Sequence, residues 1–164
     1  MVIHGWNIYF HPCFETQLNH LLEDARETVR RRPDDFRKSN AFKRLAAVSL
    51  LAFDQIPSNP AAPMYRQGST LGQHRKHWFR ATFFQQYRLF FRYSEADRAI
   101  VYAWVNDGDT LRAYGSKSDA YAVFARMLAS GHPPDSWDKL MAAVIDDEQA
   151  RAAADRVRGI QAEP

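Results

Sequence analysis

Three runs of apolar and aromatic residues follow one another between positions 78 and 106, and they limit the possible folds more than any other feature of the chain. The runs predict strands at about Trp78–Phe84, Tyr87–Tyr93 and Ala99–Asn106. Because only a few turn residues separate each run from the next, neighbouring strands are expected to run antiparallel. The sequence therefore predicts an antiparallel meander.

Two helices are expected before these strands. Apolar residues recur at helical spacing over Phe14–Val29, and a second apolar stripe covers about Ala41–Gln55. A short strand at Trp6–Phe10 precedes the first helix, and the Pro- and Gly-rich residues 56–73 predict one long loop. Adjacent helices with a short connection are expected to form an antiparallel hairpin.

After the meander, the sequence predicts a short strand at Leu111–Tyr114, a helix that Ser118 caps and a last helix near Trp137. Residues 147–164 have no aromatic and few large apolar side chains, so they are expected to form a frayed helix or a disordered tail. The predicted fold class is α+β. Two N-terminal helices would pack on a mostly antiparallel sheet, with further C-terminal helices, in one domain over residues 1–146.

A length of 164 residues suits one hydrophobic core. The hydrophobic share of 46% excludes a wholly disordered chain, and no apolar run approaches the roughly 18 residues of a membrane-spanning helix. The first residues lack the pattern of a secretory signal, and a single cysteine cannot form an internal disulfide. We therefore expect a cytoplasmic protein without a membrane partner.

The cations are concentrated in one part of the chain. The forty residues from Gln55 to Ser94 carry six Lys and Arg and no Asp or Glu, although the net charge of the chain is only +3. In the middle predicted strand, Arg88 and Arg92 point to the same face of the sheet. Such arginines are either solvated surface residues or a binding site for phosphate. The lack of carboxylates in this segment favours phosphate, and with it a nucleic acid.

His77 is a candidate general acid or base, because the unperturbed pKa of histidine, roughly 6.5, makes both protonation states accessible. Packing beside Trp78 is the alternative. Two histidine pairs, His74 with His77 and His4 with His11, suggest zinc only weakly, because neither Cys ligands nor a His-Glu-x-x-His helix accompanies them. We therefore expect no metal and no other cofactor.

Several long phrases of the chain resemble one known family. They are HPCFETQLNHLL, YRQGSTLG, HRKHWFRATFFQQYRLFFRY, IVYAWVND, LRAYGSKSDAYAVFARML and GHPPDSW, in this order between about Trp6 and Leu140. In these phrases the chain is similar to the YhaV family of bacterial type II toxins. The resemblance implies a RelE-like fold and a ribonuclease activity that halts growth. It also implies a PrlF-type antitoxin with an AbrB-like DNA-binding part, and autoregulation through binding of the toxin-antitoxin complex to operator DNA.

RelE-like toxins cut RNA without metal, by attack of the 2′-hydroxyl. The resemblance therefore implies a base, an acid and cations that hold the dianionic phosphorane. In that superfamily a strand with Tyr-Arg precedes a late Arg that lies four residues before a Tyr. Tyr87-Arg88 matches the first feature, and Lys117 with Tyr121 matches the second, with Lys in place of Arg. The catalytic candidates are His77, Arg80, Arg88, Lys117 and Tyr121. For Tyr121 the alternative is packing in the apolar stripe of its helix.

Further residues near these positions are expected to bind RNA, the messenger RNA itself or messenger RNA on the ribosome. They are Arg75, Lys76, Arg92, Arg112 and Tyr114. The sequence leaves two other functions open. One is a non-enzymatic module on the same scaffold that inhibits a protein target such as gyrase, and the other is a DNA-binding protein without toxicity. Cleavage of RNA in the presence of a chelator would separate the nuclease from both.

Overall fold

The chain forms one five-stranded sheet with helices on both faces. The computed structural model describes residues 1–164. The strand order is β1-β2-β5-β4-β3, in which β2 and β5 run parallel and every other pair runs antiparallel. The strands are β1 (Val2–Ile3), β2 (Trp6–Phe10), β3 (Phe79–Phe83), β4 (Tyr87–Ser94) and β5 (Ala99–Val105). The predicted meander of the last three strands is confirmed, and the fold class is α+β.

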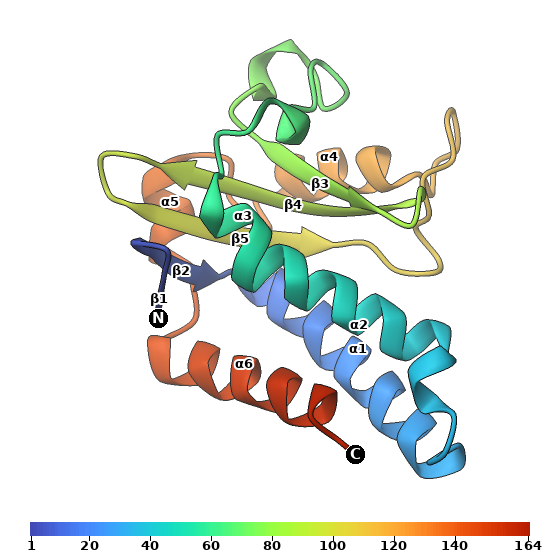
Figure 1. Ribbon diagram of the computed structural model, residues 1–164. Helices are drawn as coiled ribbons and strands as arrows, with labels where there is room; N and C mark the ends of the chain where they lie inside the picture. The colour runs from blue at the N-terminus through green and yellow to red at the C-terminus, as the bar shows by residue number, and fades with distance from the viewer.

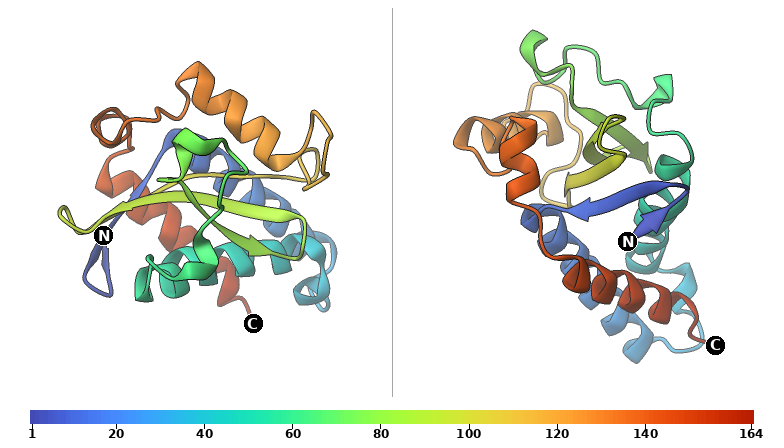
Figure 2. Two further views of the ribbon diagram at one scale, coloured as in Figure 1. Left: turned by 90° about the horizontal axis from the view of Figure 1, so that it is seen from above. Right: turned by 90° about the vertical axis from the view of Figure 1, so that its left-hand side faces the viewer.

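The helices form one layer on each side of this sheet. They are α1 (Pro12–Arg31), α2 (Asn40–Leu50), α3 (Ile56–Ser58), α4 (Ala120–Ser130), α5 (Trp137–Ala142) and α6 (Asp147–Gln161). Figures 1 and 2 place α1, α2 and α6 on one face and α4 and α5 on the other. None of these helices combines the length and the apolar character that crossing a membrane requires.

Each face of the sheet has its own hydrophobic cluster. In β4, Leu89 and Phe91 belong to the larger cluster, which α1, α2 and α6 cover, whereas Phe90 belongs to the smaller one. The Phe90 ring stacks on Phe124 of α4, with the ring centroids 4.2 Å apart. Residues alternate between the faces of a strand, so the even-numbered arginines of β4 lie on the α4 side. This alternation is the one that the sequence predicts.

The first two helices form the expected hairpin, after two strands that begin the chain. His11 caps α1, and its Nδ1 accepts a hydrogen bond of 3.1 Å from the backbone N–H of Cys13. Ser39 caps α2 in the same way through Phe42. The helical backbone continues beyond α2 through a π-turn at Leu51–Gln55 into α3. The helical backbone therefore ends at Ser58, three residues beyond the predicted end at Gln55, and the loop predicted for residues 56–73 begins only after it.

The strand predicted at Leu111–Tyr114 does not form. Strand β5 already has β2 on one side and β4 on the other, so the segment that follows it cannot turn back and pair with β5. Instead the segment is a loop that one backbone hydrogen bond, from Arg112 N–H to the carbonyl of Gln86, ties to the β3–β4 turn. The next helix begins one residue later than predicted, with Asp119 as its cap in place of Ser118.

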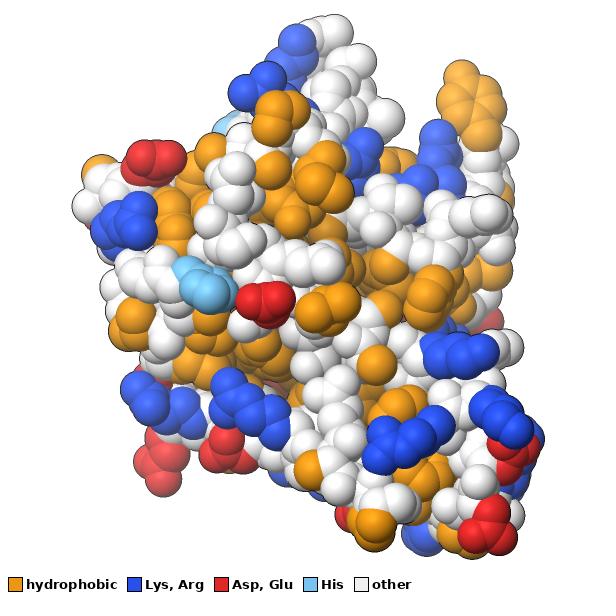
Figure 3. Space-filling model, viewed as in Figure 1, with side chains coloured by type: hydrophobic (Ala, Val, Ile, Leu, Met, Phe, Trp, Pro, Cys, Tyr) orange, Lys and Arg blue, Asp and Glu red, His pale blue; other side chains and the backbone are white.

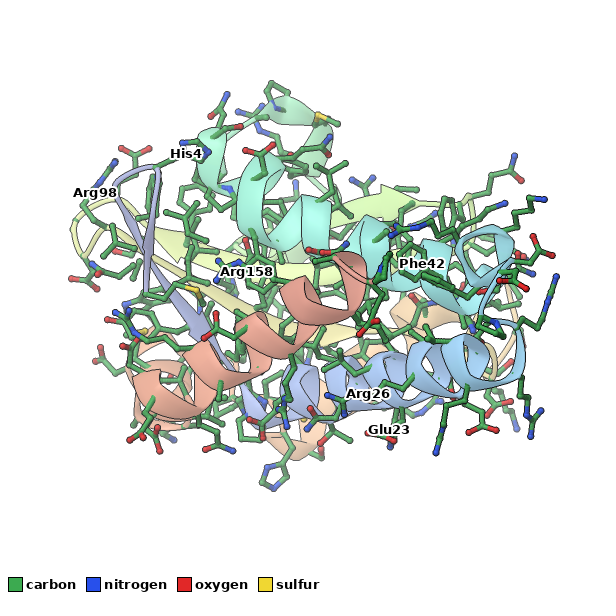
Figure 4. All side chains as sticks on the ribbon, turned by 60° about the horizontal axis from the view of Figure 1, so that its bottom comes forward. His4, Glu23, Arg26, Phe42, Arg98 and Arg158 are labelled. Atoms are coloured by element: carbon green, nitrogen blue, oxygen red, sulfur yellow. The ribbon has the colours of Figure 1, made fainter.

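The C-terminal segment, for which the sequence predicts a frayed helix or a tail, is helical from Asp147 to Gln161. This helix, α6, packs along α1 (Figure 4). Its buried side chains are Ala150, Ala153, Ala154, Val157 and Ile160. Most of them are small, which lets two helix backbones approach closely and bury area without large side chains. On α1, Arg26 and Glu23 form an exposed ion pair of 3.1 Å, labelled in Figure 4.

Candidate active site

The hydroxyl oxygen of Tyr121 accepts a hydrogen bond from each of two arginines. Nε of Arg80 and Nε of Arg88 both lie 2.9 Å from it. The two Nε atoms are therefore at most about 5.8 Å apart. Two like charges at such a separation repel each other, and an anion bound between them would relieve the repulsion. The pair is suited to hold a negatively charged group.

The register of the sheet places both arginines on one face. Arg80 on β3 pairs with Phe90 on β4, and Arg88 lies two residues before Phe90. All three side chains therefore point toward α4. Tyr121 comes from the first turn of that helix, where its ring is 6% exposed and packs edge-on against Phe90. The structure thus brings together three of the predicted site residues from two strands and a helix.

Main-chain oxygens hold the rest of each guanidinium group. Nη1 of Arg80 donates to the carbonyl of Met64 at 2.8 Å, and Nη1 of Arg88 donates to the carbonyls of Gln85 and Tyr87 at 2.7 and 2.9 Å. Neither arginine forms an ion pair with a carboxylate, and neither Nη2 has a hydrogen-bond partner in the protein. No carboxylate therefore offsets either guanidinium group, and each has a free donor for a ligand.

A third guanidinium, that of Arg112, lies against the same tyrosine. Its Cζ is 4.9 Å from the centroid of the Tyr121 ring. Asp119 fixes it through an ion pair of 2.6 Å and also caps α4 through the N–H groups of Tyr121 and Ala122. Burial opposes ionisation of Asp119, but the hydrogen bonds from Arg112 and from the backbone N–H groups outweigh it and lower the pKa of this carboxyl.

An open groove of about 440 Å³ adjoins this cluster, and Tyr121 and Arg112 belong to its lining. Its polar and charged lining is formed by three cations, one carboxylate and four uncharged residues: Arg112, Lys117, Arg126, Asp119, Thr70, Tyr114, Ser116 and Tyr121. The lining comes from the segment before β3, the loop between β5 and α4, and α4 itself. In Figure 3, Lys and Arg side chains gather on the two segments that project at the top of the view, with a notch between them. With three cations and one carboxylate in its lining, the groove has a net positive charge.

His77 belongs to a second cluster on the same face. Its Nε2 lies 2.9 Å from Oδ1 of Asp135, and the same oxygen accepts a hydrogen bond of 2.6 Å from Nε1 of Trp78. Burial opposes ionisation of Asp135, but the hydrogen bonds from Trp78 and His77 outweigh it and lower the pKa of this carboxyl. His77 is thus both oriented by a carboxylate and partly accessible, with 36% of its side chain exposed.

Arg92 lies in this second cluster and is mainly enclosed by protein. Its guanidinium is over the rings of Trp78 and Trp137, at 5.6 and 5.4 Å from their centroids, and donates to the carbonyl of Asp135 at 2.6 Å. Burial lowers the pKa of this guanidinium. Four positions along β4 separate Arg92 from Arg88, a distance of roughly 13 Å. The predicted site residues therefore form two clusters, with His77 and Arg92 in one and Arg80, Arg88 and Tyr121 in the other.

Of the remaining predicted residues, Tyr114 and Lys117 line the groove, whereas Arg75 and Lys76 are not part of its lining. Arg75 and Lys76 lie in and just after a single 3-10 turn before β3, and Arg75 donates to the carbonyl of Ala125 on α4. Lys117 is exposed in the loop before α4, and its backbone carbonyl accepts a hydrogen bond from Arg126. Tyr114 is 92% exposed. All of these residues come from loops rather than from the sheet.

Three polar residues that organise the site were not predicted from the sequence to do so. Asn106 is buried, and its side chain accepts from the N–H of Arg88 and donates to the carbonyls of Gln86 and Thr110. Asp119 could have been found as a helix cap, since Asp is a preferred capping residue. Asp135 had no local signal, because its partners lie 57 and 58 residues away in the sequence.

The two histidine pairs do not form metal sites. Nε2 of His4 contacts Asp54, and Nε2 of His77 contacts Asp135. No group of three or more His, Cys, Asp or Glu side chains is placed to hold a metal ion.

Comparison with known proteins shows the family to which the chain belongs. Residues 8–145 match the family described as a toxin with endonuclease activity, of a toxin-antitoxin system. The chain is 41% identical over 140 residues to the Ribonuclease toxin YhaV of Escherichia coli K12 and to Toxin YhaV of Escherichia coli O6:H1. Each alignment covers 84% of this chain and 91% of the relative. No solved structure matches significantly. The chain therefore belongs to the YhaV family of toxins with endonuclease activity, and an antitoxin is its expected partner.

Proposed function

We propose that this toxin is a metal-independent endoribonuclease that cuts messenger RNA at the arginine pair around Tyr121. One observation carries the proposal: two guanidinium groups without carboxylate partners converge on the hydroxyl of Tyr121, a residue that also lines a basic groove. A relative with 41% identity is named a ribonuclease, which supports RNA as the substrate. Cutting messenger RNA would stop translation and growth in the cytoplasm.

The reaction needs little from the protein beyond charge and proton transfer. A base removes the proton of the 2′-hydroxyl, the 2′-oxygen bonds to phosphorus, and the bond from phosphorus to the 5′-oxygen breaks as that oxygen gains a proton. The products are a 2′,3′-cyclic phosphate and a free 5′-hydroxyl. Charge on the non-bridging oxygens is greatest in the phosphorane, where the free Nη2 groups of Arg80 and Arg88 would stabilise it most.

Three groups are candidates for proton transfer in this scheme. The Tyr121 oxygen accepts from both arginines, so its own proton remains available to the leaving 5′-oxygen. Lys117 lies beside it in the groove and would add charge or a proton. His77, oriented by Asp135, is the third candidate. It lies just before β3 and three residues before Arg80, so their Cα atoms are at most about 11 Å apart. Depending on whether Tyr121 or His77 transfers the proton, the bond that is cut would lie at a different nucleotide of the bound RNA.

The RNA strand would extend from one cluster to the other. Arg112 and Tyr114 line the groove at one end, and Arg92 lies at the other. Arg75 and Lys76 lie on the projecting segment next to α4. The cations that reach solvent, such as Lys76, would bind the phosphate backbone without reading the bases, so their contacts would contribute affinity rather than sequence preference.

The proposal extends to the fold and the partners. We assign the chain a RelE-like fold, in which the α1–α2 hairpin packs on the antiparallel meander. We also assign it a PrlF-type antitoxin with an AbrB-like DNA-binding part, which would neutralise the toxin. The complex would then bind operator DNA and repress its own transcription. Both assignments rest on the phrases quoted from the sequence.

The test is cleavage of a defined single-stranded RNA by the purified protein in excess EDTA. We expect 2′,3′-cyclic phosphate ends, and a loss of at least about 100-fold in rate for Arg88→Ala and for Arg80→Ala. Tyr121→Phe and His77→Ala in the same assay decide which of the two clusters holds the scissile phosphate. Unchanged cleavage by folded Arg88→Ala would exclude the assigned role of the arginine pair.

A matched control separates charge at the site from charge in general. Arg158 of α6 lies over the Phe53 ring at 5.8 Å, much as Arg88 lies over Tyr121 at 5.6 Å, but on the other side of the sheet. Figure 4 shows Arg158 on α6. Arg158→Ala is expected to cut RNA at the wild-type rate. If Arg158→Ala cut RNA as slowly as Arg88→Ala, the lower rate would reflect the loss of net charge and not the loss of a specific site.

A further inference from the structure

A stack of side chains leads from the arginine cluster to the surface. The Arg112 guanidinium contacts two aromatic rings, with its Cζ 4.9 Å from the centroid of Tyr121 and 5.4 Å from that of Tyr114. Tyr121 is buried, whereas Tyr114 is 92% exposed. The outer end of the stack is therefore an aromatic ring in open solvent at the border of the basic groove.

The loop that presents Tyr114 is held in place on both sides. Before it, the backbone N–H of Arg112 donates to Gln86 at 2.9 Å, and the N–H of Ala113 donates to Oδ1 of Asp119 at 2.8 Å. After it, the N–H of Ser116 donates to the carbonyl of Ala113 at 3.0 Å and closes a turn in which Gly115 has a φ of +80°, a left-handed conformation that glycine adopts without strain. A ring on such a loop loses little conformational freedom when it binds a ligand.

A single exposed aromatic residue is ordinary on a protein surface. Tyr114 differs because a cation is stacked on it and because Lys117 and Arg126 line the same groove. The combination of a free aromatic ring with cations along a groove is the arrangement by which proteins hold single-stranded nucleic acid. The ring would stack on a base while the cations contact the phosphates on either side.

We propose that Tyr114 stacks on an unpaired nucleobase of the substrate, next to the phosphate held by Arg80 and Arg88. This inference rests on the proposed function and adds a substrate class to it. Bases in a duplex are covered on both faces, so the site would select single-stranded RNA. Every base has a π-face, so the site would tolerate all four bases and select for an unpaired strand rather than for a sequence.

The test measures binding without cleavage. A single-stranded 2′-O-methyl RNA oligonucleotide has no free 2′-hydroxyl to act as nucleophile, and its affinity is measured by fluorescence anisotropy at fixed salt. Tyr114→Leu, which keeps an apolar side chain without a ring, is expected to weaken binding roughly 5- to 100-fold, whereas Tyr114→Phe stays within about 2-fold of wild type. Leu50→Ala, at an exposed apolar position on α2, is the control and is expected to bind normally.

An abasic nucleotide moved along the oligonucleotide identifies the stacked base. At one position the missing base should weaken binding by the wild-type protein as much as the Tyr114→Leu substitution does. At the same position it should not weaken binding by Tyr114→Leu any further. If the abasic nucleotide lowered the affinity of the wild type and of Tyr114→Leu equally at every position, stacking would be contradicted. An affinity for duplex RNA equal to that for single-stranded RNA would contradict it as well. Because no cleavage is involved, this result is independent of the nuclease assay. A protein that binds as described but leaves RNA uncut in EDTA would refute only the proposed function.

Discussion

Nε of Arg88 donates a hydrogen bond of 2.9 Å to the hydroxyl of Tyr121 and thereby joins β4 to the first turn of α4. Tyr121→Phe removes this acceptor and that of Arg80 while it keeps the buried ring. We expect a loss of stability of about 1–3 kcal/mol, because two charged donors lose a partner. We also expect a much lower cleavage rate, because the two guanidinium groups lose their common anchor. Urea denaturation and the EDTA cleavage assay measure the two effects.

Tyr102→Phe is the matched control for that prediction. The Tyr102 hydroxyl is buried and donates to the carbonyl of Ala52 at 2.6 Å, on the opposite face of the sheet. Its removal is expected to cost about 1–2 kcal/mol of stability and to leave the cleavage rate per folded molecule unchanged. A Tyr121→Phe variant that cut RNA as fast as Tyr102→Phe would show that the hydroxyl is structural only.

The stability of the protein is expected to fall at mildly acidic pH because of His11. Burial, with a smaller contribution from the nearby His132, lowers the pKa of His11 from 6.5 to about 4. Below pH 6.5 the unfolded chain binds a proton at this position that the folded chain rejects, so stability is lost as the pH falls toward 4. The loss between pH 7.5 and pH 5 is about 2 kcal/mol for a shift of this size.

Denaturant titrations of wild type and His11→Asn at both pH values check this. Asn keeps a capping oxygen for the N–H of Cys13 and cannot take up the proton. Between the two pH values, the free energy of unfolding of the variant is expected to fall by about 2 kcal/mol less than that of the wild type. His20→Asn, at an exposed position of α1, should behave as the wild type. An equal pH dependence in His11→Asn would mean that other groups cause the loss.

Neighbouring positions on α6 are expected to differ sharply in their effect on stability. Val157 is fully buried, so Val157→Ala should cost about 2 kcal/mol. The side chain of Arg158 is 55% exposed and pairs with Asp155, so Arg158→Ala should cost no more than about 0.5 kcal/mol. Thermal denaturation of the two variants measures the difference. Equal stability of the two variants would mean that α6 contributes little buried contact with α1, as expected for the frayed helix or tail that the composition of the segment predicts.

The sequence predicts those features of the sheet that depend on neighbouring residues of one strand. In β4 the alternation of Leu89 and Phe91 with Arg88, Phe90 and Arg92 requires no knowledge of the rest of the fold, because it follows from the period of a strand. The same reasoning cannot detect that β5 lacks a free edge, so it predicts a strand at Leu111–Tyr114 that does not form. It also underestimates α6, whose small residues bury area only because α1 lies beside them.

The amino-acid sequence by itself determined the meander, the helical hairpin and the carboxylate-free basic segment, because each depends on residues that are close together in the chain. Only the tertiary structure decided which residues share a site. The Tyr121 hydroxyl meets arginines 33 and 41 residues away, and Asp135 meets His77 across 58 residues. Such contacts depend on how α4 and the loop after it pack on the sheet. For this reason the structure separates His77 from Arg88, although both lie in one basic segment of the sequence.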